Sequence, residues 1–196
     1  MSNKIYPIGI QNFEKLRLGG YFYIDKTALI YKMVKTGSYY FLSRPRRFGK
    51  SLLISTLEAY FEAKRDLFEG LAVEALEKDW VKRPVFHLDL NIGKYDTPDS
   101  LDKILNETLD YWESLYGTRS AETTLALRFA GVVGRAYEQS GERVAILIDE
   151  YDKPLLQAIG NEELQREFRN TLKPFYGVLK TMDGCIKFAL LTGVTK

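Results

Sequence analysis

The chain of 196 residues is long enough to bury one sizeable core and too short to suggest several domains. Its 28 Lys and Arg residues against 26 Asp and Glu residues give a formal net charge of +2, so no overall field favours nucleic acid, a membrane surface or an acidic substrate. The single cysteine, Cys185, excludes an internal disulfide and is expected to be a buried small hydrophobic residue.

The N-terminal residues lack the apolar run of a secretory signal, and no apolar stretch approaches the ~20 residues that a membrane span requires. We therefore expect a soluble, cytoplasmic protein with no membrane partner. The chain stops at Lys196, directly behind the apolar run 188–192, which suggests the N-terminal part of a longer protein. We expect one domain over residues 1–196, in which residues 1–37 form an N-terminal prelude.

Strand-like and helix-like segments alternate along the chain, with no internal repeat, low-complexity tract or linker. In chain order the pattern predicts a helix over 26–36, a strand over 38–42, a helix over 50–60, a strand over 85–90, a helix capped by Asp99 or Ser100, a helix over 121–139, a strand over 144–148, a helix with an apolar stripe from Leu164 to Leu179, and a strand over 186–191. The helix near Ser100 places Leu101, Ile104, Leu105, Trp112 and Leu115 on one apolar stripe. Four strands separated by helices predict an α/β fold, a three-layer α/β/α sandwich with ligands at the carboxyl ends of its strands.

A phosphate-loop motif stands between the first predicted strand and the helix that begins at Lys50. Residues 44–51 read Arg-Pro-Arg-Arg-Phe-Gly-Lys-Ser, and Gly49, Lys50 and Ser51 supply a free backbone, a cation for the β/γ-phosphates and a hydroxyl for magnesium. Arg44 occupies the position of the usual first glycine, which removes the positive-φ freedom expected there. The alternative is an ordinary helix entry with a solvated lysine.

Three arginines crowd this loop: Arg44, Arg46 and Arg47. One interpretation is a solvated basic turn that Pro45 stiffens. The other is that an arginine contacts phosphate, a neighbouring subunit's nucleotide in a homo-oligomer, or polyanionic DNA. The full set of candidate nucleotide-binding residues comprises Arg46, Arg47, Phe48, Gly49, Lys50, Ser51 and Leu52.

Two carboxylates end the most apolar strand. Residues 144–148 are all apolar, as in a central parallel strand, and Asp149 and Glu150 follow at once. In a P-loop NTPase the aspartate would reach magnesium and the glutamate would orient the attacking water. These two residues alone could simply begin a polar loop. Together with the Gly-Lys-Ser segment they predict binding of ATP or GTP.

Thr192 ends the last predicted strand, where NTPases of the additional-strand class place a polar sensor between the magnesium carboxylate and the γ-phosphate. Its alternative role is to satisfy a turn before Gly193. Asp152 and Lys153 are interpreted as loop residues, and the alternative is that they support the site. His87, the single histidine, is expected to be a packed or edge residue of its strand, and no metal cluster of His and Cys can form around it.

The prelude is rich in aromatic residues and precedes the phosphate loop. We expect it to cover a sheet edge. The alternative is that some of Ile8, Ile10 and Phe13 form a wall of an adenine pocket.

With these residues in place, the chain resembles the AAA-ATPase-like family of bacterial proteins, whose members are often joined to a C-terminal restriction-endonuclease-like nuclease domain. The resemblance covers nearly the whole chain and is most specific in Ser-Arg-Pro-Arg-Arg-Phe-Gly-Lys-Ser at 43–51. The other matching segments are Pro7-Ile-Gly-Ile10, Tyr23-Ile-Asp-Lys-Thr27, His87-Leu-Asp-Leu90, Leu147-Ile-Asp-Glu-Tyr-Asp-Lys-Pro154 and Thr192-Gly-Val194.

The resemblance implies an AAA-like P-loop core of the additional-strand class in which Arg44 belongs to the family's own form of the loop. Phosphate binding then falls to Gly49, Lys50 and Ser51, and the acidic roles fall to Asp149 and Glu150. It also implies that the fifth core strand, the helical lid and any nuclease domain lie beyond this chain.

The sequence thus predicts an ATP-binding module that hydrolyses ATP with Mg²⁺, in which Lys50, Glu150 and Thr192 are catalytic and Ser51 and Asp149 hold the metal. The hydrolysis would be coupled to a fused or partner domain. One alternative is a nucleotide-bound switch or scaffold that turns over negligibly and regulates a nuclease. A third is a DNA-binding module led by the arginine loop, which the charge of +2 favours least.

Overall fold

A computed structural model describes residues 5–45 and 47–194. The helices are α1 (Phe13–Leu18), α2 (Thr27–Thr36), α3 (Lys50–Phe61), α4 (Ala72–Leu76), α5 (Ser100–Tyr116), α6 (Leu125–Ser140), α7 (Lys153–Gln157) and α8 (Glu162–Thr181). The strands are β1 (Tyr39–Ser43), β2 (Val85–Asp89), β3 (Val144–Asp149) and β4 (Ile186–Gly193). Short 3₁₀ turns occur at η1 (Arg65–Phe68), η2 (Leu90–Ile92) and η3 (Asp183–Cys185).

The four strands form one parallel sheet in the order β1-β4-β3-β2, which confirms the predicted α/β fold. The last strand of the chain, β4, lies between β1 and β3. Because all strands run the same way, the loops that follow β1, β3 and β4 leave the sheet at one edge. The register fixes that edge, since Ser43 pairs with Gly193 and Asp89 pairs with Asp149.

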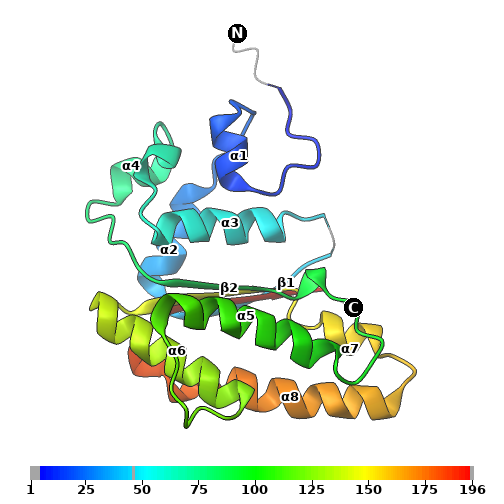
Figure 1. Cartoon of the computed structure of the whole chain (residues 1–196). Coiled ribbons are helices and arrows are strands. Elements are labelled where there is room, and N and C mark those ends of the chain that lie inside the picture. The colour runs from blue at the N-terminus through cyan, green and yellow to red at the C-terminus, as the bar shows by residue number, and fades with distance from the viewer. Residues whose placement is uncertain (1–4, 46, 195–196) are drawn as a thin grey trace.

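Helices cover both faces of the sheet, as Figure 1 shows. Every residue of β3 is buried, which explains why its sequence is a continuous apolar run. On one face Ala145 and Leu147 of β3 pack in a core with α2, α3 and Trp80. On the other face Ile146 and Ile148 pack in a second core with α5, α6, α8 and Trp112. The alternation of side chains along β3 therefore joins the two cores through one strand.

The longest helix, α8, follows from its sequence. Asn161 caps it by accepting a hydrogen bond from the backbone N–H of Leu164 at 3.1 Å, and Glu162 and Glu163 lie in the first turn, where the helix dipole favours acids. The predicted stripe is buried at each of its positions: Leu164, Phe168, Leu172, Phe175 and Leu179. The helix continues through Pro174 to Thr181.

Several sequence-based expectations are corrected. Helix α6 begins at Leu125 rather than near 121, because the Thr124 hydroxyl caps it by accepting from the N–H of Leu127. Leu115, assigned to the apolar stripe of α5, is 55% exposed. Cys185 is half-buried rather than buried.

The aromatic N-terminal part of the prelude does not cover a sheet edge, since its helix α1 packs on α3, on the side away from the sheet (Figure 1). The last helix of the prelude, α2, lies beside β1, an outer strand of the described sheet, where the Tyr40 hydroxyl donates to the Met33 carbonyl at 2.9 Å. Phe13 is fully buried against Tyr23 and Phe68, so it cannot form a wall of a nucleotide pocket, whereas Ile8 is almost fully exposed. Among the described residues, no helix combines the length and the apolar character needed to cross a bilayer.

Candidate functional site

The loop between β1 and α3 explains how an arginine replaces the expected glycine. Positive φ angles in the described part of this loop occur at Arg47, at 68°, and at Gly49, at 76°. Arg44 instead continues from β1, and its backbone N–H donates to the Gly193 carbonyl of β4 at 3.2 Å. The left-handed backbone is needed later in the loop, so Arg44 meets no conformational penalty. Arg46 lies outside the described residues.

Helix α3 begins directly at the loop and presents backbone donors to it. Its first intrahelical bond runs from the N–H of Leu53 to the carbonyl of Gly49, at 3.0 Å. The N–H groups of Lys50, Ser51 and Leu52 therefore have no carbonyl partner within the helix and carry the positive end of its dipole. This arrangement is suited to an anion.

Lys50 is held inside the loop that it is expected to serve. Its ammonium lies 2.9 Å from the Arg44 carbonyl and 3.1 Å from a Glu150 carboxylate oxygen, and the residue is only 5% exposed. Such a buried cation needs close oxygen partners. A phosphate that entered the loop would have to replace Glu150 as the ionic partner of Lys50.

Asp149 accepts two hydroxyl donors from two other elements. The Ser51 hydroxyl of α3 donates to Asp149 Oδ2 at 2.7 Å, and the Thr192 hydroxyl of β4 donates to Asp149 Oδ1. The Thr192 oxygen in turn accepts the backbone N–H of Glu150 at 3.3 Å. Asp149 is 3% exposed and Thr192 is fully buried, so these bonds fix the carboxylate in one orientation.

Glu150 adopts a backbone conformation that is unusual for its residue type. Its φ is 53°, in the left-handed region, which costs a non-glycine residue about 1–2 kcal/mol. The surrounding bonds hold it there, since its N–H binds Thr192 and its carboxylate binds Lys50. The turn directs the Glu150 side chain back toward the start of α3.

The structure thus brings together five of the predicted residues: Lys50, Ser51, Asp149, Glu150 and Thr192. Two other candidates in the loop lie differently. Phe48 is exposed. The Leu52 side chain is half-buried and packs against the core beside α3, so Leu52 can offer the loop only its backbone N–H, which points along the helix axis.

Further contacts at the same sheet edge were not predicted. The Asp152 carboxylate accepts the N–H of Val194 at 3.1 Å, and the Lys153 ammonium binds the side chain of Asn91, just after β2, at 2.9 Å. The Asp89 carboxylate accepts the N–H of Asn91 at 2.8 Å. The only sequence signal for Asn91 was that it follows a strand whose carboxyl end lies at the ligand edge of a parallel sheet.

The donor set fits magnesium. A hydroxyl from Ser51 and a carboxylate from Asp149 lie within hydrogen-bond distance of each other. Mg²⁺ prefers such oxygen ligands and commonly takes only one or two from protein, with substrate phosphates and water completing its sphere. Within the described ranges no group of three or more His, Cys, Asp or Glu residues could hold a metal on its own.

Comparison with known families assigns the chain to a family. A family model described as "Predicted AAA-ATPase" matches residues 7–196. The chain belongs to this predicted AAA-ATPase family. The matched range includes the loop between β1 and α3, the carboxylates at the end of β3, and Thr192.

One curated relative matches the full chain. The chain is 40% identical over 198 residues to an uncharacterized protein in the vnfD 5' region of Azotobacter chroococcum mcd 1. The alignment covers the whole of this chain and spans 38% of the relative's length. No solved structure matches the chain.

Proposed function

We propose that this domain binds ATP and hydrolyses it with magnesium. The observation that carries the proposal is the cluster of Lys50, Ser51, Asp149, Glu150 and Thr192, which β1, β3 and β4 deliver to the N-terminus of α3. The position of β4 between β1 and β3 supports the additional-strand class of P-loop NTPases, with its AAA-like core. The loop and the helix N-terminus hold phosphate, and the acidic pair serves the metal and the water.

Each residue has a role that its contacts support. Lys50 leaves Glu150 and neutralises charge on the transferred phosphoryl group. Glu150, once released, accepts a hydrogen bond from the attacking water and orients it. Thr192 keeps Asp149 fixed and holds the Glu150 backbone in its left-handed turn. Bound Mg²⁺, held by Ser51 and Asp149, would supply charge neutralisation of the phosphate oxygens.

Binding and turnover are separated by two substitutions. Calorimetry with ATP and magnesium, followed by phosphate release in the same sample, measures both in the wild type. Lys50→Ala should weaken ATP binding by about 100-fold, which corresponds to one strong charge-assisted contact. Glu150→Gln should bind ATP at least as tightly as wild type, because it no longer neutralises Lys50, and should release no phosphate. Equal loss of ATP binding in both variants would contradict these roles.

One observation favours a second candidate, a switch that retains nucleotide and turns over negligibly. The Lys50 to Glu150 distance of 3.1 Å keeps the proposed base engaged by a cation. If the pair persisted with ATP bound, Glu150 could not orient water. Stoichiometric ATP retention without phosphate release by the wild type would select this switch over the ATPase.

We further propose that residues 1–196 act within a longer protein as its nucleotide-responsive part. The relative that extends well beyond the matched region supports an additional domain. The sequence suggests three partners. They are a fused nuclease domain, further copies of the chain in an oligomer where a neighbouring subunit's arginine completes the site, and DNA bound through Arg44 and Arg47. Nuclease assays on the longer protein, with Lys50→Ala as the control, test whether ATP regulates such a domain.

A further inference from the structure

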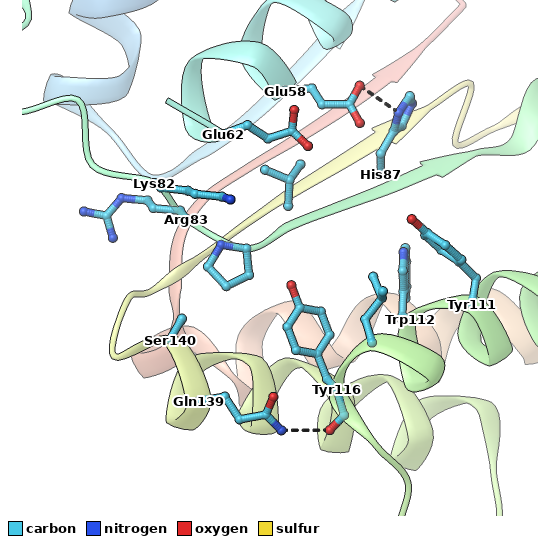
Figure 2. A pocket seen from close by; sticks show the side chains of 13 residues that line it. Glu58, Glu62, Lys82, Arg83, His87, Tyr111, Trp112, Tyr116, Gln139 and Ser140 are labelled. Atoms are coloured by element: carbon cyan, nitrogen blue, oxygen red, sulfur yellow. Dashed lines mark hydrogen bonds and ion pairs between the residues drawn. The ribbon is translucent and has the colours of Figure 1, made fainter. Parts of the chain in front are cut away.

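A groove runs along the outer edge of the sheet, away from the nucleotide site. Within the described residues β2 pairs with β3 on one side and with no strand on the other. A cavity of about 640 Å³ lies against β2 (Figure 2). It is bounded by α3 on one wall and by α5 on the other, and we call it the β2 groove. Its lining residues that matter here are Glu58, Glu62, Val85, His87, Tyr111 and Leu115.

The two walls differ in chemistry. On the α3 side, Glu58 and Glu62 extend toward the groove, with the Glu58 carboxylate 3.5 Å from Nδ1 of His87 (Figure 2). On the α5 side, the wall is aromatic and aliphatic and carries no charged lining residue. Tyr111 and Leu115 there are 63% and 55% exposed. An occupant would therefore meet acid on one side and apolar surface on the other.

The floor of the groove consists of backbone groups of β2. The N–H of Ala145 in β3 donates to the carbonyl of Pro84 at 2.9 Å, and Val85 is paired with Ala145. In a parallel ladder, alternate residues direct both their N–H and C=O to the same neighbour. That bond shows that the backbone hydrogen-bonding groups of Pro84, Phe86 and Leu88 point toward β3. Val85 and His87 therefore direct their N–H and C=O groups away from β3, toward the groove.

Spacing along the groove matches an extended chain. Glu58 on α3 and the C-cap residue Glu62 are four residues apart, as are Tyr111 and Leu115 on α5, and four residues of α-helix rise about 6 Å. Side chains on one face of a strand recur about every 6.6 Å. In Figure 1 both helices run alongside β2. A strand placed beside β2 would thus meet the two carboxylates with one face and the two exposed α5 side chains with the other.

We propose that the β2 groove binds an extended segment of a partner protein, which adds to the sheet as a strand beside β2. Basic side chains of that segment face Glu58 and Glu62, and the alternating apolar or aromatic side chains face Tyr111 and Leu115. Backbone hydrogen bonds to Val85 and His87 supply affinity, and the two walls supply specificity. The proposal does not depend on the nucleotide site.

The charges in and around the groove favour a basic guest. Glu58 has only the histidine as an ionic partner among the described residues, and Glu62 shares Lys64 with Glu14. Of the cations that line the groove, Arg83 is already paired with Glu142 at 2.6 Å. Lys82 lies before β2, beside Arg83 at the end of the groove away from His87 (Figure 2). Each carboxylate of the α3 wall thus has one ionic partner and retains oxygen lone pairs that can accept from a further cation.

The probe is a capped, fluorescent seven-residue peptide, Val-Lys-Val-Lys-Tyr-Lys-Val, titrated with the whole domain and followed by anisotropy. A matched peptide carries Glu in place of each Lys. We expect the lysine peptide to bind at least tenfold more tightly than the glutamate peptide. The amide of His87 should exchange with solvent more slowly when the lysine peptide is bound.

Two protein variants test the backbone and the wall separately. Val85→Pro removes an N–H that faces the groove, which an edge strand tolerates, whereas Val85→Thr retains it. Val85→Pro should lower peptide affinity at least tenfold, and Val85→Thr should not. The double variant Glu58→Gln, Glu62→Gln leaves the backbone intact and should lower the affinity for the lysine peptide alone. ATP binding should be unchanged in all three variants.

Three results would overturn the proposal. The wild type could fail to bind the lysine peptide at millimolar concentration, which would mean that the charged walls only guard the edge against pairing. The double Gln variant could bind it as tightly as wild type. Sedimentation could show a concentration-dependent dimer in which the Val85 amide is protected without peptide, and the groove would then belong to a second copy.

Discussion

The carboxyl edge of the sheet and the β2 groove carry polar groups in opposite states. At the carboxyl edge, Lys50, Ser51, Asp149 and Thr192 are buried or half-buried, and all of them bind one another or Glu150. In the β2 groove, the backbone groups of Val85 and His87 face the cavity, and Glu58 and Glu62 each have one ionic partner. A ligand at the first place must exchange partners with an existing network, whereas a ligand at the second adds contacts that were not made before.

This difference predicts what each region tolerates. The bound network at the carboxyl edge is preorganised, so removal of one member should affect both the fold and the ligand. Changes in the groove should leave the fold nearly intact, because surface substitutions away from buried features alter stability by about 0.5 kcal/mol or less.

The largest expected effect is at Asp149. Asp149→Ala removes the carboxylate that binds both hydroxyls, so magnesium should no longer strengthen ATP binding. Loss of even an outer-shell partner of a metal ligand typically reduces metal affinity by about 10–100-fold, and loss of a ligand should cost at least as much. Calorimetric titration of ATP with and without magnesium measures the difference. Asp152→Ala is the matched control, because among the described residues that carboxylate accepts only the Val194 amide. A magnesium effect that survived Asp149→Ala would place the metal elsewhere.

Thr192→Val should have an intermediate effect. The substitution keeps the shape and removes the hydroxyl that links Asp149 to the Glu150 backbone, which leaves buried polar groups unpaired. We expect a loss of about 1–3 kcal/mol in unfolding free energy, measured by urea titration. Thr192→Ser retains the hydroxyl and should recover most of it. If both variants unfolded at the same urea concentration, the hydroxyl would have no structural role.

The smallest effect concerns His87 beside the groove. Burial lowers the pKa of His87, but the hydrogen bond and charge of Glu58, aided by Asp89 and Asp149, raise that pKa above its ordinary value. A raised folded-state pKa contributes stability below about pH 6.5, the unfolded value, and that contribution disappears as the pH rises through the folded pKa. The difference in unfolding free energy between wild type and His87→Gln should therefore decrease as the pH rises above about 6.5.

NMR titration can follow this group without ambiguity, because the chain contains one histidine. Glu58→Gln should move the His87 pKa downward. An unchanged His87 pKa in that variant would show that Glu58 is not the ionic partner of His87.

The sequence predicted the carboxyl edge of the sheet far better than the groove. The all-apolar run of β3 and the Gly-Lys-Ser segment are local patterns, and each placed its candidate residues at a strand end or a helix start. The left-handed turn at Glu150 has no such pattern, because contacts with Thr192 and Lys50 hold it. Asn91 was missed because the residue it binds, Lys153, lies 62 positions away.

The groove could not be predicted because strand order depends on packing between distant segments. No pattern in residues 85–89 predicts that β2 is the outermost strand of the described sheet. Leu115 fell on the apolar stripe of α5 by its spacing, yet it is exposed because it lines the β2 groove rather than the core. An apolar residue on the correct helical face is therefore not proof of a core position.

The two tryptophans lie on opposite sides of the sheet, Trp80 among the side chains packed with α3 and Trp112 among those packed with α5. The fluorescence of each tryptophan therefore reports on the packing of a different layer. Trp80→Phe leaves one emitter in the wall of the β2 groove, in edge contact with Phe86, and Trp112→Phe leaves one in the other layer. Fluorescence from these two variants can distinguish whether the layers loosen together or in sequence on heating.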